Sequence, residues 1–312
     1  MRKQCLQTVY ELAQKDPNVV FIGSDLGPGT LQAFKDNLPA RFFMEGISEQ
    51  HIVGMAAGLA LCGKVVYVNT IASFLTRRCY EQNMLDLGLG HCNVRLIGNG
   101  GGTVYAPLGP THLAIEDLAI MRVIPNMTVL APCDAEEMRI LTEQTLTYEG
   151  PVYIRVAKGG DPIVPKDSSS IHIGKVVTYA SGQEVLFITT GIMLNRALLL
   201  AERLRQQGHD IGLIHVHTLN PIDTPGILAA AHGVNAVITF EEHVATGGLG
   251  SAVADILMAA PTPAPAWFKK FSLPDGFVTG YGSQDQQLEK AGLDVASMEH
   301  SLHEILSVMS GA

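Results

Sequence analysis

The stretch that decides the fold reads Glu45-Gly46-Ile47-Ser48-Glu49-Gln50-His51-Ile52-Val53-Gly54-Met55-Ala56-Ala57-Gly58-Leu59-Ala60. After Ser48 it consists mainly of apolar and small residues, which predicts a buried helix packed against another chain, with Ser48 as a candidate cap. Glu49 places a charge at the start of this helix. The helix N-terminus favours the ionised carboxylate, whereas burial favours the neutral acid. A ligand nitrogen that shares the proton would resolve this conflict; a plain capping role for Glu49 is the alternative.

The composition describes a globular chain. With 312 residues, of which 47% are hydrophobic, the chain can bury the cores of two ordinary domains. The net charge of -9 offers no basic surface for nucleic acid or an anionic membrane. No apolar run reaches the length of a membrane span, and the N-terminus lacks a signal core. We therefore expect a cytoplasmic protein without nucleic-acid or membrane partners.

The cysteines do not indicate a metal site or a disulfide framework. There are five of them, and no two form a Cys-x-x-Cys pair. Such an odd and scattered set is typical of buried thiols in a reducing compartment. The sequence thus predicts no metal ligands in this chain.

Short apolar runs alternate with helical stretches along the chain. Candidate strands lie at 19–22, 65–68, 94–97, 127–130 and 152–154, and again at 184–190, 211–216 and 234–240; helices are expected at 134–148, 193–207 and 248–258. This alternation predicts an α/β fold with two domains, each a mostly parallel sheet flanked by helices. A polar stretch at 158–170 reads as the linker, so the expected domains are 1–165 and 170–312.

Two glycine-rich turns need to be weighed as nucleotide sites. Gly98-Asn99-Gly100-Gly101-Gly102 follows a strand, but no helix comes next, which disfavours a dinucleotide fold. Gly247-Gly248-Leu249-Gly250 does open a helix, yet it lacks the third glycine and the acidic residue of the fingerprint. A tight strand-to-helix turn explains these glycines equally well.

Several segments together resemble the transketolase family. The helix at 46–60, the turn Ser73-Phe74-Leu75-Thr76-Arg77-Arg78-Cys79-Tyr80-Glu81-Gln82 and the segment Gly109-Pro110-Thr111-His112 resemble the pyrimidine-binding domain. Thr218-Leu219-Asn220-Pro221-Ile222-Asp223 and Phe240-Glu241-Glu242-His243 resemble the transketolase C-terminal domain. The resemblance covers essentially the whole chain in the family's order.

The resemblance also implies a partner. Full-length transketolases carry a further domain with a Gly-Asp-Gly segment that holds Mg²⁺ and the cofactor diphosphate, and this sequence contains no Gly-Asp-Gly. The chain thus looks like the C-terminal subunit of a split transketolase. Thiamine diphosphate would be shared across the interface with an N-terminal subunit that holds Mg²⁺, in an α2β2 heterotetramer.

The family assigns roles to five residues at the cofactor. Glu49 would hydrogen-bond the aminopyrimidine nitrogen, so that the cofactor's thiazolium carbon can become a nucleophile. Phe74 and Tyr80 would wall the pyrimidine, although either could be an ordinary core aromatic. Arg77 stands where many full-length transketolases have a stacking Phe. Asp25 matches an Asp that faces the cofactor across the dimer; a turn-forming Asp is its alternative.

His112 matches the histidine that contacts the reacting end of the donor ketose. There it can donate hydrogen bonds as negative charge develops on oxygen. A helix-capping role is the alternative. His243 is a possible loop contact.

The substrate-recognition pattern departs from the family. Leu108 replaces an Asp that binds sugar hydroxyls, Gly100 replaces a phosphate-contacting His, and Gly29 replaces a phosphate-contacting Ser. Arg155 and Arg2 remain as cations that could bind an anionic sugar. We therefore expect transfer of a two-carbon ketol unit to an acceptor other than the standard pentose phosphates: a sulfonated, nucleotide-linked or neutral aldehyde, or one with a differently placed anionic group.

Other functions share this architecture. A β-type subunit of a 2-oxoacid dehydrogenase, or an acyloin-forming enzyme like deoxyxylulose-phosphate synthase, would use the same cofactor. The Gly-Pro-Thr-His and Glu-Glu-His segments favour transketolase. A non-catalytic scaffold is disfavoured because both Glu49 and His112 are present.

Overall fold

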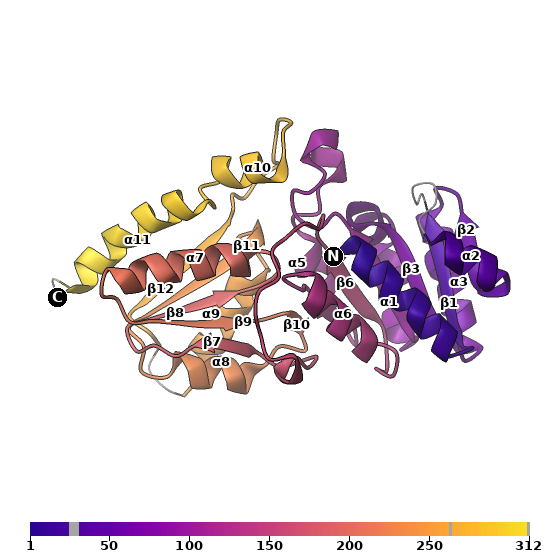
Figure 1. Ribbon diagram of the computed structural model, residues 1–312, viewed down its shortest axis with the longest axis horizontal. Helices are drawn as coiled ribbons and strands as arrows, with labels where there is room; N and C mark the ends of the chain where they lie inside the picture. Colours follow the sequence, from indigo (N-terminus) through magenta and orange to yellow (C-terminus); the bar gives the residue numbers. More distant parts are fainter. Residues whose placement is uncertain (25–30, 262–263, 311–312) are drawn as a thin grey trace.

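The computed structural model describes residues 1–24, 31–261 and 264–310, which fold into two α/β lobes side by side (Figure 1). The first sheet contains β1 (Val19–Ser24), β2 (Phe42–Glu45), β3 (Val65–Ile71), β4 (Val94–Asn99), β5 (Thr128–Leu130), β6 (Val152–Val156) and β10 (Thr218–Asn220). The second contains β7 (Val177–Ala180), β8 (Val185–Thr189), β9 (Ile211–His215), β11 (Ala236–Val244) and β12 (Trp267–Leu273). The helices are α1 (Arg2–Lys15), α2 (Gln32–Asn37), α3 (Glu49–Leu61), α4 (Tyr80–Gln82), α5 (Asp117–Arg122), α6 (Ala135–Gln144), α7 (Met193–Gln206), α8 (Thr224–Ala231), α9 (Leu249–Ala259), α10 (Gln284–Lys290) and α11 (Val295–Ser310).

Both sheets are mostly parallel. The strand order is β10-β5-β6-β4-β3-β1-β2 in the first and β12-β11-β8-β9-β7 in the second. Only β10 and β7, each at a sheet edge, pair antiparallel to their neighbours within the described residues. The predicted α/β class with two helix-flanked sheets is therefore confirmed.

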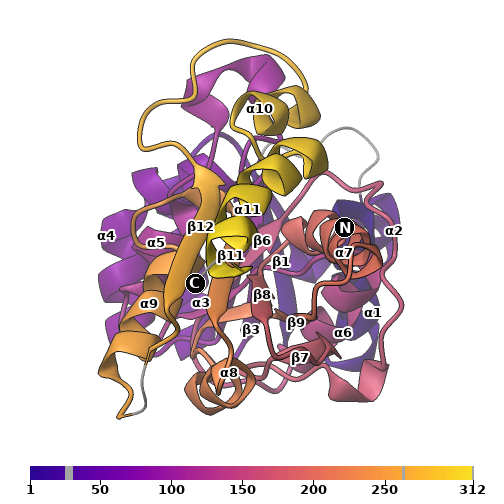
Figure 2. The same ribbon diagram turned by 90° about the vertical axis from the view of Figure 1, so that its left-hand side faces the viewer.

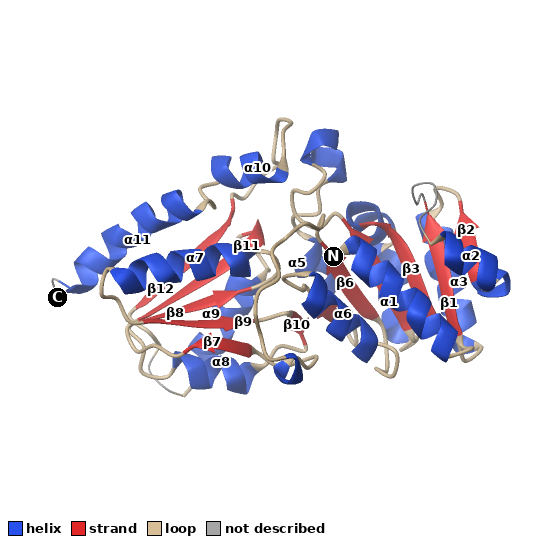
Figure 3. Ribbon diagram, viewed as in Figure 1, coloured by secondary structure: helices blue, strands red, loops and turns tan. Residues whose placement is uncertain are grey.

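Helices cover both faces of each sheet (Figures 2 and 3). Successive strand residues point to opposite faces. In the first lobe, Phe21 and Tyr67 pack in the cluster that contains α1 and α6, whereas Ile22 and Val68 pack in the cluster that contains α3 and α5. In the second lobe, α7 and α11 belong to the former cluster, and α8 and α9 to the latter. The strands are consequently buried on both sides, which explains their continuous apolar runs.

One strand from the second half of the chain joins the first sheet. β10 follows the second lobe's β9, yet it pairs with β5 of the first sheet, with Thr218 opposite Leu130. The sequence analysis did not anticipate β10, because three residues are too few to show an alternating pattern. It also missed β2, β7 and β12. The pairing of β10 with β5 ties the second half of the chain to the first lobe.

The topology places the candidate catalytic segments at one edge. β1, β2, β3 and β4 run parallel, so their carboxyl ends lie at the same edge of the sheet. Glu49 follows β2, Phe74 follows β3, and His112 lies in the excursion after β4. Ligands of open parallel sheets bind at this edge.

Candidate active site

Glu49 opens α3 and is buried, with 2% of its surface exposed. Its Oε2 lies 2.6 Å from Nη1 of Arg78, whose side chain is 44% exposed. Arg78 thus supplies the partner that the buried carboxylate requires. Ser48 makes no side-chain capping hydrogen bond; its hydroxyl donates to the Gly46 carbonyl instead, so the predicted cap is wrong.

Phe74 links Glu49 to His112. The Arg78 guanidinium lies 4.5 Å from the centre of the Phe74 ring, and the His112 ring packs edge-on against the same ring with centroids 5.1 Å apart. His112 Nδ1 is 2.9 Å from the hydroxyl of Thr111. The structure therefore connects both candidate catalytic residues to one aromatic ring, His112 by direct contact and Glu49 through Arg78.

The remaining aromatic candidate, Tyr80, is half-buried and donates its hydroxyl hydrogen bond to the Ile120 carbonyl at 3.1 Å. Its ring packs against the apolar cluster that includes α3. Nearby, burial and the charge of Glu49 raise the pKa of Cys79 to about 12. That thiol stays protonated near neutral pH, so Cys79 is no nucleophile here.

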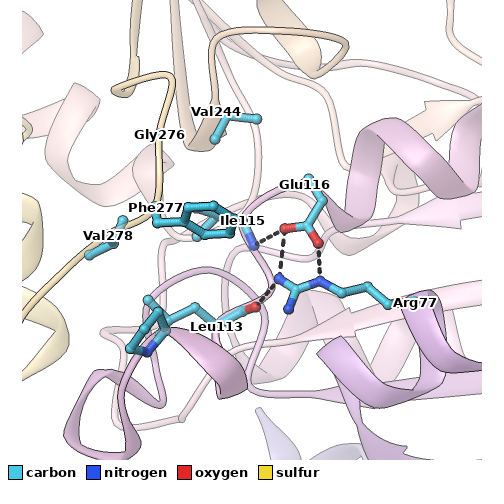
Figure 4. Close-up of a pocket in the computed structure, with 9 residues that line it drawn as sticks. Arg77, Leu113, Ile115, Glu116, Val244, Gly276, Phe277 and Val278 are labelled. Atoms are coloured by element: carbon cyan, nitrogen blue, oxygen red, sulfur yellow. Dashed lines mark hydrogen bonds and ion pairs between the residues drawn. The ribbon is translucent and has the colours of Figure 1, made fainter.

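Arg77 and Glu116 form an ion pair on the wall of a cavity of about 440 Å³ between the lobes (Figure 4). Arg77 also donates to the Leu113 carbonyl. Burial opposes ionisation of Glu116, but the hydrogen bonds and charge of Arg77 hold its pKa below the usual value. Phe277 of the second lobe lies across the cavity from this pair.

The candidate substrate-binding residues differ from one another in burial and position. Leu108 is 53% exposed at the end of a 3₁₀ turn in the excursion that carries His112. Gly100 is buried with φ of 78°, and a Cβ there would meet the Tyr105 ring at 2.1 Å, so no side chain fits. Arg2 is half-buried at the start of α1. Asp25 and Gly29 lie outside the described residues.

Arg155 is engaged inside the protein. Its Nε lies 3.1 Å from Oδ2 of Asp117, and its Nη2 donates to the carbonyls of Ala114 and Glu242, both at 2.9 Å. Ala114 and Asp117 belong to the first lobe and Glu242 to the second. These contacts give Arg155 a role in joining the lobes, which the sequence analysis did not foresee.

The second glycine-rich turn serves a buried carboxylate. Oxygens of Glu241 accept hydrogen bonds from the amides of Leu249 and Gly250, at 2.7 and 2.8 Å, at the start of α9. A Cβ on Gly248 would come within 1.9 Å of that carboxylate. His243, two residues after Glu241 in β11, accepts a hydrogen bond from the amide of Ala119 in the first lobe at 3.2 Å. The Glu241 carboxylate thus occupies the place at the start of α9 where a nucleotide phosphate would otherwise bind.

Sequence reasoning missed Arg78, Glu116 and Phe277. Arg78 could have been found, because a buried Glu49 beside two consecutive arginines invites an ion pair. Glu116 and Phe277 meet Arg77 only through tertiary folding, so local spacing carries no signal for them. Within the described residues, no helix is both long and apolar enough to cross a membrane.

Residues 1–160 match the model of the family "Transketolase, pyrimidine binding domain", and residues 174–298 match "Transketolase, C-terminal domain". The chain belongs to the transketolase family. This membership confirms the resemblance drawn from the sequence, and thiamine diphosphate is the cofactor that the family implies.

Relatives of similar length include two that are named as transketolase subunits. The 6-deoxy-6-sulfo-D-fructose transketolase subunit SqwH of Clostridium sp. (strain MSTE9) is 33% identical over 306 residues, covering 98% of this chain and 94% of that one. A subunit of the apulose-4-phosphate transketolase of Phocaeicola vulgatus is 35% identical over 295 residues, covering 94% and 93%. A solved structure described as "Split gene transketolase, inactive beta4 tetramer" is 34% identical, has a TM-score of 0.89 and covers 98% of each chain.

Proposed function

We propose that this chain is the pyrimidine-binding half of a transketolase that works with a separate N-terminal subunit. The main support for this proposal is a series of contacts that runs from buried Glu49 through Arg78 and Phe74 to His112. In this series the Phe74 ring contacts the His112 ring directly and Glu49 through Arg78. That arrangement suits an aminopyrimidine and the sugar that reacts beside it.

The residues present fit thiamine diphosphate. When bound, this cofactor supplies a carbon nucleophile that carries the two-carbon unit. Glu49 would hold the proton shared with the pyrimidine nitrogen, and Phe74 and Tyr80 would exclude water from the ring. In the chain alone, Arg78 forms an ion pair with the Glu49 carboxylate. Because the Arg78 side chain is nearly half exposed, it would move into solvent when the pyrimidine binds.

His112 would act on the substrate. Its half-buried ring packs against Phe74, and its Nδ1 is within hydrogen-bonding distance of Thr111 Oγ1. A proton on Nε2 would then stabilise the oxygen of the ketose as charge develops there.

The partner would bring the diphosphate and Mg²⁺ sites, and two copies of each chain would form the active unit. Support comes from α3, which leaves Gly54, Gly58 and Leu61 exposed although the helix is apolar. Ile47 and Leu89 add exposed apolar surface to the same lobe. Apolar surface of this kind marks an interface with another subunit.

We propose an acceptor other than the standard pentose phosphates. Leu108 and Gly100 remove polar groups, and the Tyr105 ring fills the space beside Gly100. The relatives from Clostridium and Phocaeicola act, by their names, on a sulfonated ketose and on apulose 4-phosphate. This chain would accept a comparably unusual aldehyde.

Reconstitution tests this function. The chain would be mixed with the N-terminal subunit, thiamine diphosphate, Mg²⁺ and hydroxypyruvate as a general two-carbon donor, and a panel of aldehydes would be offered. We expect new ketoses to form only when both chains are present. Absence of ketol transfer from the assembled pair with every aldehyde would contradict the proposal.

A further inference from the structure

A second group of reactive side chains lies buried where the lobes meet, away from the Glu49 site. Sγ of Cys133, a carboxylate oxygen of Glu137 and a ring nitrogen of His215 all lie within 4.8 Å of one another. Cys133 and Glu137 bracket the start of α6 in the first lobe, whereas His215 ends β9 in the second. All three are buried, and His217 lies next to them, its ring centroid 6.3 Å from that of His215.

The contacts of His215 place one ring nitrogen at the cluster and the other at a hydroxyl. Nδ1 lies 2.9 Å from Thr189 Oγ1, which can accept from or donate to that nitrogen. Nε2 lies 3.2 Å from Oε2 of Glu137, which also accepts a hydrogen bond from the Cys133 amide at 2.7 Å. A metal ion that replaced the proton between Nε2 and Oε2 would have both groups as ligands.

Two further atoms of the cluster lack partners. Among the described residues, neither Oε1 of Glu137 nor Nε2 of His217 has a hydrogen-bond partner, although both are buried. His217 Nδ1 is 2.8 Å from the hydroxyl of Thr218, a contact similar to that between His215 Nδ1 and Thr189. Histidine ligands of metals characteristically use the second nitrogen in this way. Buried polar atoms without partners are costly, and a bound ion would satisfy them.

We propose that Cys133, Glu137 and His215 bind a divalent metal of the zinc class, with His217 as the fourth ligand. Thiolate, carboxylate and imidazole are the donors that Zn²⁺ prefers. A tetrahedral ion with bonds of about 2.1 Å separates its ligand atoms by about 3.4 Å, close to the spacing of His215 and Glu137. The His217 ring lies beside that of His215, and its unpartnered Nε2 would be the fourth donor.

The neighbouring charges are compatible with this ion. Lys166 Nζ lies 2.5 Å from Asp134 Oδ2 and 3.2 Å from Cys133 Sγ. The lysine and Asp134 neutralise each other, while the thiolate and the Glu137 carboxylate neutralise the metal. The ammonium then donates a hydrogen bond to a metal-bound sulfur, a contact of the kind that supports metal ligands from outside.

The metal would hold the two lobes together. Its ligands come from both, beside the hydrogen bond from the Ala131 amide to the His217 carbonyl. Because the ligands are buried, the ion would enter during folding and stay bound. Its role is to fix the lobes and not to react with substrate.

Elemental analysis of the full chain tests the proposal. Protein expressed with added zinc and passed into metal-free buffer should retain about one Zn²⁺ per chain. Refolding with Co²⁺ should produce a sulfur-to-cobalt charge-transfer band in the near ultraviolet. Protein that holds no metal by either route would overturn the proposal.

Variants locate the ion. Cys133→Ser and His215→Gln should lose the metal, and His217→Ala should bind it more weakly. Cys5→Ser and His209→Gln serve as controls for a buried thiol and a paired histidine elsewhere, and both should retain about one ion. Zinc that persists at full stoichiometry in Cys133→Ser and His215→Gln would contradict the assignment. Should either variant fail to fold, the cobalt band of the unaltered chain decides alone.

Discussion

Glu49 and Glu242 are both buried carboxylates, yet their surroundings differ. Glu49 pairs with Arg78, a side chain that is nearly half exposed. Glu242 accepts hydrogen bonds from the amide and hydroxyl of Thr103 and from Gln284, at 2.7 to 3.0 Å. A Cβ on Gly102 would come within 2.2 Å of its carboxyl group.

The difference separates a binding group from a structural one. The partners of Glu242 include backbone and packed side chains of both lobes, so exchanging them means opening the interface. Glu49 can exchange its partner by the movement of one surface arginine. Burial alone therefore does not identify a catalytic acid; we propose that the exposure of its partner distinguishes Glu49 from Glu242.

The largest effect should come from Glu49→Gln, which keeps the shape but cannot share a carboxyl proton. In the complex with the N-terminal subunit, deprotonation of the cofactor's thiazolium carbon should slow by about 10²–10⁴-fold. Hydrogen–deuterium exchange at that carbon measures it. Glu81→Gln, an exposed position in the same segment, is the control and should exchange normally. Equal rates in both variants would return Glu49 to a structural role.

Arg155→Met tests the structural side of the comparison. It leaves Asp117 buried without its cation, so the free energy of unfolding should fall by about 3–5 kcal/mol. Urea titration measures this change, and Arg139→Met, which removes exposed ion pairs, should cost less than about 1 kcal/mol. A fully stable Arg155→Met with a raised KM for anionic acceptors would instead restore the prediction that Arg155 binds substrate.

His112→Ala should lower kcat by about 10² with every donor, because it removes a hydrogen bond to developing charge. His232→Ala, an exposed histidine of the second lobe, is the matched control. Steady-state kinetics of the assembled enzyme measure both. If only one donor is affected, His112 selects substrate instead of taking part in the common step.

Leu108→Asp should have the smallest effect. Leu108 is already exposed, so the free energy of unfolding should change by less than about 0.5 kcal/mol. The added carboxylate restores a group for sugar hydroxyls, so activity with xylulose 5-phosphate and ribose 5-phosphate should rise relative to the native acceptor. Efficient use of those two sugars by the unaltered enzyme would refute the proposed change of acceptor.

The fold class could be predicted from the sequence, because strands of a parallel sheet that is buried on both faces consist of continuous apolar runs, as at 19–22 and 65–68. The family resemblance also predicted roles for Glu49, Phe74 and His112, because the motifs that carry it are local. It could not supply Arg155 to Asp117, Thr103 to Glu242 or the β10 pairing, since those contacts join segments far apart in the chain. The proposed metal site could not be predicted for the same reason. Positions 133, 137 and 215 do not follow the short spacing of a known metal-binding motif, and the cysteine pattern alone predicted no site.

The central claim is that this chain carries half of a cofactor site. Titration calorimetry of thiamine diphosphate with Mg²⁺ tests it directly, with this chain alone, the N-terminal subunit alone and the mixture. The account predicts weak or undetectable binding to this chain by itself, and tight, saturable binding and ketol transfer in the mixture. Tight binding by this chain alone would contradict it.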